Sequence, residues 1–174
     1  TAMNENIKDI VTLRAMEPED LDLLYRIEND TKLWDVGCTN VPYSRFTLHN
    51  YIADCMNDIY TDKQLRLIIE NTNGDVVGII DLMNFEPRHM RAELGIVIMS
   101  RYRRKGYATA AIRKIISYSR NILHIHQLYA FVSADNNASE KLFASLGFTK
   151  SSILTDWLYK DGDFDDAILM QFFL

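Results

Sequence analysis

Apolar positions repeat in two ways along this chain, and the two repeats separate predicted helices from predicted strands. Spacings of three and four residues indicate helices at 17–27, 44–59, 106–121 and 136–146. Short apolar or alternating runs indicate strands at 11–14, 65–70, 76–82, 92–99, 128–132, 153–159 and 164–173. Strands joined first by hairpins and then through helices predict an α+β domain with a mixed, mostly antiparallel sheet of about seven strands and about four helices.

Glycines mark the turns of this pattern. Asn73-Gly74 and Asp161-Gly162 each lie between two predicted strands and favour hairpins, because both pairs tolerate positive φ. Gly147 is expected in the left-handed conformation that ends a helix, with Phe148 packing back. Residues 34–42 predict a loop, and the two helices on either side of it form a predicted lid over a substrate site.

The length of 174 residues fits a single domain over 1–174, and Thr1-Ala2 ahead of Met3 resembles a cloning remnant. Cys38 and Cys55 form no C-x-x-C pair, which favours a reducing cytoplasm. No apolar run approaches the roughly 20 residues of a membrane span, and no secretory signal pattern is present. We therefore expect a soluble cytoplasmic protein without a membrane partner.

Positive charge is concentrated in one part of the chain. Between Leu94 and Ala134 there is no Asp or Glu, and seven Lys and Arg side chains lie in this window. With a total charge of −5, the remainder carries −12. One cationic block in an acidic protein suits a small polyanion better than a nucleic acid, so we expect no nucleic-acid partner.

The cationic block follows the apolar strand 92–99 and opens the helix 106–121. At a helix start, several backbone N–H groups lack intrahelical partners, so a phosphate group can bind there. Gly106 lets the backbone approach such a ligand, and Arg and Lys side chains supply charged donors. The loop matches neither a Walker A sequence nor G-x-G-x-x-G, but residues 103–108 match R-x-x-G-x-A.

This segment resembles the pyrophosphate loop, [Q/R]-x-x-G-x-[G/A], of the GNAT superfamily of acetyl-CoA-dependent N-acetyltransferases. Residues 136–148 resemble the second block of that family, an N-x-x-[A/S] helix that ends in L-G-F. The two blocks lie in the family's order, and the resemblance covers 11–174. Segments 13–21, 90–94 and 161–167 are most similar to the branch of spermidine N-acetyltransferases and ribosomal-protein N-terminal acetyltransferases.

The resemblance implies a single GNAT-like domain with acetyl-CoA as cosubstrate and direct attack by a primary amine in a ternary complex. In the family, the strand before the pyrophosphate loop separates from its neighbour and binds the pantetheine and the thioester oxygen through its backbone. Carried over, the cofactor contacts are Ile96, Val97, Ile98, Arg103, Arg104, Lys105, Gly106, Tyr107, Ala108, Thr109, Asn136 and Ser139. A helix cap is the alternative role for Asn136.

The resemblance also frames the acid and base chemistry. Glu93, at the start of the cofactor strand, is the first candidate for the base, and Asp81 on the neighbouring strand is the second; a water relay fits better than direct abstraction. Phe143 stands where many family members have a tyrosine that protonates the leaving thiolate. A thiol can leave as thiolate, with water or another tyrosine substituting, and Phe143 can equally be a core residue.

The resemblance implies that the acceptor is a small-molecule amine or a peptide N-terminus. The acidic side chains that flank the predicted pocket would attract a cationic amine, and ordinary surface acidity is the alternative explanation for them. A polyamine is one option, and a ribosomal-protein N-terminus or an antibiotic amine is the alternative. Two departures from the spermidine acetyltransferases that the chain resembles weaken the polyamine option. Those enzymes carry consecutive glutamates just after a tryptophan, whereas residues 35–38 after Trp34 have none, and Asn84 stands where those enzymes have another acid.

The sequence also leaves open whether the protein is an enzyme and whether it forms an oligomer. A CoA-binding module without enzymatic activity and an RNA- or ribosome-associated protein are alternatives to an enzyme, and a homo-oligomer is compatible with the sequence. His124 and His126 have no third ligand at metal spacing, so no metal site is expected.

Overall fold

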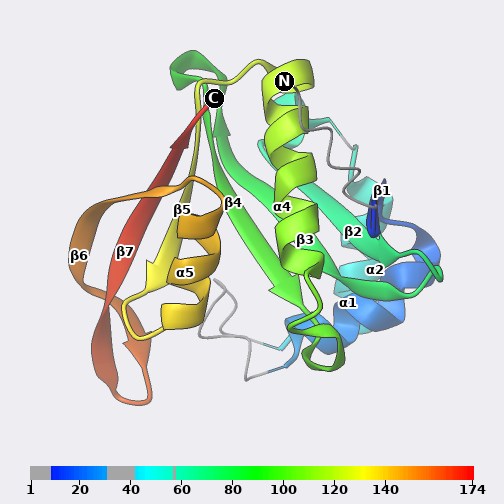
Figure 1. Ribbon diagram of the computed structural model, residues 1–174. Coiled ribbons are helices and arrows are strands. Elements are labelled where there is room, and N and C mark those ends of the chain that lie inside the picture. The colour runs from blue at the N-terminus through cyan, green and yellow to red at the C-terminus, as the bar shows by residue number, and fades with distance from the viewer. Residues whose placement is uncertain (1–8, 31–41, 57) are drawn as a thin grey trace.

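The computed structural model describes residues 9–30, 42–56 and 58–174. Its sheet has the strand order β1-β2-β3-β4-β5-β7-β6, and every neighbouring pair is antiparallel except β4 and β5. The seven strands are β1 (Val11–Ala15), β2 (Leu65–Asn71), β3 (Val76–Glu86), β4 (Arg91–Ile98), β5 (Gln127–Ser133), β6 (Thr149–Lys160) and β7 (Asp163–Phe173). The predicted mixed, mostly antiparallel sheet is confirmed (Figure 1).

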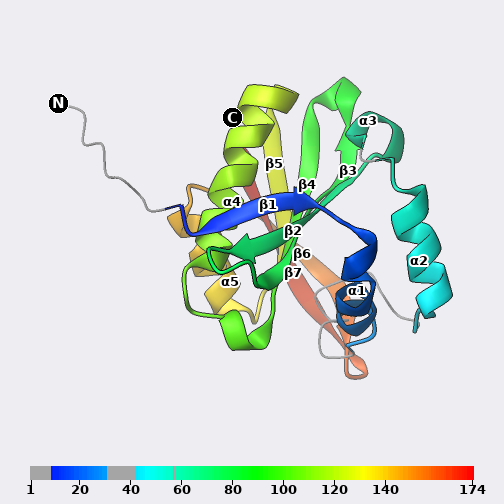
Figure 2. The same cartoon turned by 90° about the vertical axis from the view of Figure 1, so that its right-hand side faces the viewer.

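Helices cover both faces of the sheet (Figures 1 and 2). The α-helices are α1 (Leu21–Glu28), α2 (Arg45–Asp54), α3 (Ile59–Asp62), α4 (Tyr107–Tyr118) and α5 (Asn137–Ser145). α4 and α5 lie on one face, and α1 and α2 lie on the other, which we call the acceptor face (Figure 2). None of the helices in the described ranges is long and apolar enough to cross a membrane.

Each face has its own apolar core. Under α4 and α5, the inward sides of the central strands meet Ile112, Ile115 and Phe143 in the larger core. Under α1 and α2, Leu24 and Leu48 pack on Ile68 and Ile79 in the smaller one. Successive strand residues point to opposite faces, so the residues between those of the larger core face α1 and α2.

The glycine turns form as the sequence indicates. Asp161 and Gly162 have φ of 50° and 88° in the β6–β7 hairpin, and Gly74 has φ of 80° in the β2–β3 hairpin. Gly147 has φ of 99°, and the Phe148 N–H donates to the Phe143 carbonyl at 3.1 Å, which closes the end of α5.

The predicted helix 44–59 is wrong as a single helix. α2 begins at the expected cap, where the Ser44 side chain accepts from the Thr47 N–H, but it ends at Asp54. A second helix, α3, starts after Asp58, whose side chain accepts from the Tyr60 N–H at 3.1 Å. The N-cap at Asp58 therefore starts a new helix, although the apolar spacing continues from 44 to 59. Of the predicted loop 34–42, only Pro42 lies inside the described residues.

Candidate active site

The central feature of the site is the separation of β4 from β5. The two parallel strands pair only through Arg91, Ala92 and Glu93 on β4, opposite Gln127, Leu128 and Tyr129 on β5. Beyond Glu93, β4 continues to Ile98 along β3, whereas β5 continues along β7. Figure 1 shows the resulting V between the two strands, open toward the start of α4.

Backbone groups of β4 point into this V. The Met99 N–H donates to the Val77 carbonyl at 2.9 Å, which sets the alternation of the antiparallel β3–β4 pair. The backbone groups of Val97 therefore face β3, and those of Ile96 and Ile98 face the V. The Ile98 carbonyl accepts from Arg103 Nε at 3.1 Å, so the N–H and C=O groups of Ile96 and the N–H of Ile98 are the ones directed into the V.

The basic turn leads from β4 to the N-terminus of α4. A short 3₁₀ turn at Ser100–Tyr102 is followed by Arg104 with φ of 60° and by Gly106 with φ of 82° as the N-cap. The side chains from Arg103 to Lys105 are exposed, and Tyr107, Ala108 and Thr109 form the half-buried first turn of α4. A helix N-terminus with free N–H groups and exposed cationic side chains around it fits an anionic group such as a pyrophosphate.

The remainder of the basic block lies on the helix surface. Lys114 on α4 pairs with Asp9 at 2.8 Å, and Arg113 and Arg120 are exposed along the helix and the wide turn that follows it. These three side chains lie one or more helical turns from the N-terminus of α4. Of the basic block, only the turn at residues 103–106 lies at the N-terminus of α4.

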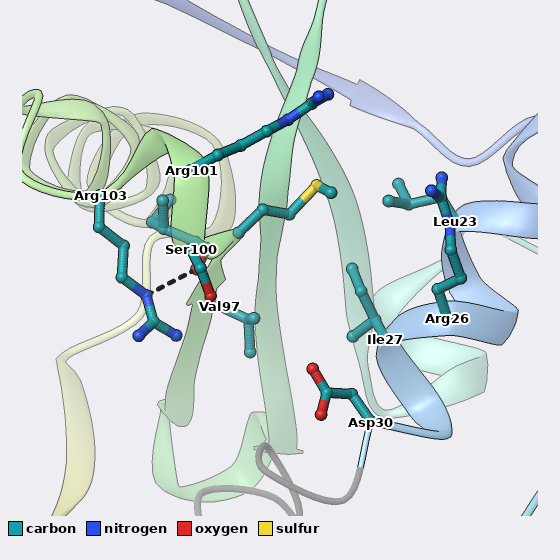
Figure 3. Close-up of a pocket in the computed structure, with 10 residues that line it drawn as sticks. Leu23, Arg26, Ile27, Asp30, Val97, Ser100, Arg101 and Arg103 are labelled. Carbon is teal, nitrogen blue, oxygen red and sulfur yellow. Dashed lines mark hydrogen bonds between the residues drawn. The ribbon is translucent and has the colours of Figure 1, made fainter.

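A cavity of about 310 Å³ lies between α1 and the end of β4 (Figure 3). Arg26, Ile27 and Asp30 line it from the α1 side. Residues 97–101 and Arg103 line it from the β4 side. The cavity therefore extends from the basic turn to the acceptor face. The side chain of Val97 lines it there.

The second predicted cofactor block begins at α5. Asn136 is the N-cap of this helix, and its Oδ1 accepts from the Ser139 N–H at 3.1 Å. Ser139 is half-buried in the first turn. The capping alternative for Asn136 is confirmed, and it leaves the donor side of the same carboxamide available for a second role.

Phe143 lies on the inward side of α5, with 5% of its surface exposed. Its ring packs edge-on against Phe148, with 5.0 Å between the ring centroids. The structure therefore places Phe143 in the core, which is one of the two roles expected from the sequence.

Glu93 lies where β4 and β5 begin to separate. Its side chain points to the acceptor face, because its neighbours Ala92 and Leu94 belong to the larger core. Asn84 Nδ2 donates to Glu93 Oε2 at 2.7 Å, from a backbone position with φ of 48°. Partial burial raises the pKa of Glu93, and the Asn84 hydrogen bond opposes this rise. A carboxylate with a raised pKa beside an opening is suited to accepting a proton from an acceptor.

Asp81 has a different environment. Arg66 binds both of its oxygens, at 2.8 and 3.2 Å, and also donates to Glu28 at 2.7 Å. The three side chains lie mostly buried beneath α1 and α2, with the guanidinium over the ring of Tyr51. Burial raises the pKa of Asp81 and Arg66 lowers it. Asp81 therefore holds an ion pair in place, whereas only one Glu93 oxygen accepts from Asn84.

Some of the expected features fall elsewhere. The spacing of His124 and His126 allows a shared strand face, but both precede β5, and His124 takes φ of 51° at the end of the turn after α4. Among the described residues, no group of three or more His, Cys, Asp or Glu is placed to hold a metal ion. The segment around Trp34 and Asp35 lies outside the described residues.

Two groups of contacting side chains on the acceptor face were not predicted from the sequence. One is the ion pair of Arg66 with Asp81 and Glu28, whose members come from β2, β3 and α1. The other is a row of aromatic side chains at Tyr129, Phe131 and Trp157. The alternation at 128–132 is a signal for the two β5 aromatics, since it places them opposite the core, but no local signal marks Trp157 as their neighbour.

Comparison with known proteins agrees with this geometry. The family model described as acetyltransferase (GNAT) domain matches residues 11–149. The spermidine N(1)-acetyltransferase of Escherichia coli K12 is 28% identical over 163 residues, which cover 94% of this chain and 86% of that protein. The putative ribosomal N-acetyltransferase YdaF of Bacillus subtilis is 27% identical, with 93% of this chain and 90% of that protein covered.

Solved structures of the spermidine N-acetyltransferase from Vibrio cholerae share the fold. The complex with CoA and spermine superposes with a TM-score of 0.84 at 24% identity, covering 95% of this chain and 96% of the other. A dodecameric form of that protein gives a TM-score of 0.80 at 24% identity, with 95% of both chains covered. At this level of identity the superposition demonstrates a common architecture.

Proposed function

Since this chain belongs to the GNAT acetyltransferase family and is an acetyl-CoA-dependent N-acetyltransferase, we propose that its acceptor is a primary amine of a polyamine. The observation that carries the proposal is the parting of β4 from β5 at Glu93, directly ahead of the basic turn. It brings together an opening for a thioester, an anion site and a carboxylate. The likeness to the spermidine enzyme and the acidic acceptor face support a cationic acceptor.

The proposed cosubstrate site runs along the V. Acetyl-CoA supplies the acetyl group as a thioester. The backbone groups of Ile96 and Ile98 bind the pantetheine and polarise the thioester carbonyl, the Val97 side chain lines the path, and the basic turn binds the pyrophosphate. At the start of α5, Asn136 and Ser139 complete the site.

The proposed base is Glu93, acting through a water molecule. One of its oxygens is held by Asn84, and the other remains to take a proton from the acceptor ammonium. Asp81 becomes the less suitable base because Arg66 occupies both of its oxygens. Its proposed role is to keep Arg66 and Glu28 in place beneath α1.

Replacing Gly106 by alanine tests the anion site. A Cβ at this position meets only Ile10 Cδ1 at 3.8 Å, so the change fits sterically but strains a φ of 82°. We expect about tenfold weaker CoA binding by calorimetry, since the N–H groups of the turn no longer converge on the pyrophosphate.

Gly74→Ala is the matched control for this test. Gly74 has φ of 80° and open space around it in a distant hairpin, so it carries the same strain, about 1 kcal/mol, without facing the cosubstrate. Equal CoA affinities for the two variants would contradict the placement of the pyrophosphate at Gly106.

Replacing Phe143 by tyrosine tests the leaving-group end of the site. If the para position of this ring points toward the thioester sulfur, a hydroxyl there protonates the departing thiolate, and we expect kcat at saturating substrates to rise about tenfold. Phe148→Tyr is the control. The Phe148 ring packs against Phe143, so this change adds a hydroxyl elsewhere in the same core and is expected to leave kcat unchanged. An unchanged kcat in the Phe143 variant would count against this geometry.

The function is tested by free-thiol release from acetyl-CoA across polyamines, N-terminal peptides of ribosomal proteins and aminoglycosides. We expect turnover with spermidine and spermine. The similarity to YdaF supports the ribosomal N-terminus as second candidate, and turnover with peptides alone would replace the polyamine assignment. We also propose a homo-oligomer, from the likeness to the dodecameric Vibrio cholerae protein, and a cytoplasmic location, from the cysteine usage.

A further inference from the structure

A row of three aromatic side chains runs along the acceptor face from the proposed base outward. Tyr129 on β5 lies opposite Glu93 in the register of the parallel pair. Its ring meets Phe131 edge-on, with 5.8 Å between the centroids at an angle of 80°. Phe131 in turn stacks on Trp157 of β6, at 6.0 Å and 28°. The row therefore connects the point where β4 and β5 part with the outer edge of the sheet.

Trp157 reaches this row because β6 bulges. The pairing of β6 with β7 shifts register between Leu154 and Leu158, so the three residues between them have no regular partner. Within the bulge, Asp156 takes φ of 50°, and its N–H donates to Asp166 Oδ1 at 2.9 Å. A bulge that is held by its own hydrogen bond re-aims a side chain, and here it brings the indole onto Phe131.

The outer part of the row is open to solvent. Phe131 is 36% exposed and Trp157 is 56% exposed, although both rings are large and apolar. Exposed stacked rings offer flat faces that bind methylene chains by dispersion and ammonium groups by cation–π attraction.

Acidic side chains lie at both ends of the row. Glu93 is beside Tyr129, and Asp156 and Asp166 hold the bulge beside Trp157. At the inner end Arg91 also lies beside Tyr129 and offsets part of the Glu93 charge, so the carboxylates favour a cation most clearly at the outer end of the row. A ligand that matches this arrangement has an apolar chain between two positively charged groups.

We propose that Tyr129, Phe131 and Trp157 bind the methylene chain and distal ammonium of the acceptor, and so select diamines and polyamines over monoamines. The inference rests on the proposed function, since it places the reacting amine at Glu93. Phe131 and Trp157 bind the chain and the distal ammonium, and neither takes part in proton transfer. Losing Trp157 then weakens acceptor binding and leaves the chemical step unaffected.

The test compares Trp157→Ala with two variants of matched character. Trp157→Phe keeps an aromatic face, and Tyr159→Ala removes another exposed ring two residues along the same strand. Spermidine binding to the CoA-loaded protein is measured by calorimetry, and KM and kcat are measured for spermidine and for n-butylamine. Thermal unfolding checks that all variants are folded.

We expect Trp157→Ala to weaken spermidine binding and to raise its KM about tenfold, with kcat within twofold of wild type. Trp157→Phe is expected to recover most of the affinity and Tyr159→Ala to match wild type. In Trp157→Ala, KM for n-butylamine, which has no distal ammonium, is expected to change less than KM for spermidine. If Trp157→Ala binds spermidine more weakly but the wild-type protein does not acetylate spermidine, the proposed polyamine acetyltransferase activity would be refuted. The proposal that the aromatic row binds spermidine would be retained. Wild-type affinity in Trp157→Ala, or no spermidine binding by wild type, would overturn the inference.

Discussion

Replacing Glu93 by glutamine is expected to lower kcat about 100-fold at neutral pH, because glutamine keeps the shape of the side chain and cannot accept a proton. The Asn84 amide can still donate to the side-chain oxygen of glutamine, so β3 keeps its conformation at Asn84. The KM for acetyl-CoA is expected to stay within twofold, since the pyrophosphate binds at the other end of β4. Steady-state kinetics with spermidine as acceptor measures both constants.

Glu86→Gln is the matched control for this change. Glu86 is the last residue of β3, the strand that also carries Asn84. Its carboxylate accepts a hydrogen bond from the Arg88 N–H, and the side-chain oxygen of glutamine can accept the same bond. We expect wild-type kcat for this variant. A kcat for Glu93→Gln within fivefold of wild type would remove Glu93 from the mechanism.

The pH dependence gives the same assignment an independent readout. Glu93 acts as a base only when it is deprotonated, so kcat/KM falls as the pH drops through its pKa. Because burial raises this pKa, we expect the acidic limb at a higher pH than for a solvated glutamate. Asn84→Ala removes the hydrogen bond that opposes the rise and is expected to move the limb further up.

Replacing Arg66 by methionine is expected to lower the free energy of unfolding by about 3 kcal/mol, because it leaves two carboxylates side by side in a mostly buried place. Methionine fills much of the volume of the arginine stem, so the loss reports the missing charge and hydrogen bonds more than a cavity. Urea denaturation of the protein without ligands measures the difference.

Arg45→Met provides the control. Arg45 pairs with Asp22 on the surface of the same helical layer, with 54% and 75% of the two side chains exposed, and such pairs contribute less than about 1 kcal/mol. The double variant Arg66→Met with Asp81→Asn is expected to recover part of the loss, since it removes the charge of one of the two neighbouring carboxylates. Equal losses in Arg66→Met and Arg45→Met would show that the buried group adds no specific stability.

Together the two predictions separate the roles of two carboxylates that lie on the same face of the sheet. Glu93 has one oxygen bonded to a neutral amide beside an opening, whereas Asp81 has both oxygens bound to a guanidinium. A variant of Glu93 should therefore change the rate without changing the stability, and a variant of Arg66 should change the stability first. The sequence ranks Glu93 ahead of Asp81 from its position at the start of the cofactor strand, and the hydrogen-bond partners now give a physical reason for that order.

The sequence by itself determined most of the local structure and the family, and it predicts the anion site. Ser44, Gly147 and the Asp161-Gly162 turn act within a few residues of their own positions, so their effects can be predicted without knowing what packs around them. The basic turn is equally local, because a strand, a glycine and a helix start follow one another directly. Where two local signals competed, as at Ser44 and Asp58, the prediction of one continuous helix was wrong.

Only the tertiary structure decided which of these residues share a site. The parting of β4 from β5 depends on the whole strand order, and the contact of Arg66 with Asp81 and Glu28 depends on the register of β2 with β3 and on the position of α1. The stacking of Trp157 on Phe131 depends on a bulge and on β7 lying between their strands. These contacts join residues far apart in the chain. They form because assembling the sheet and burying its two cores select one strand register, and no local sequence pattern specifies that register.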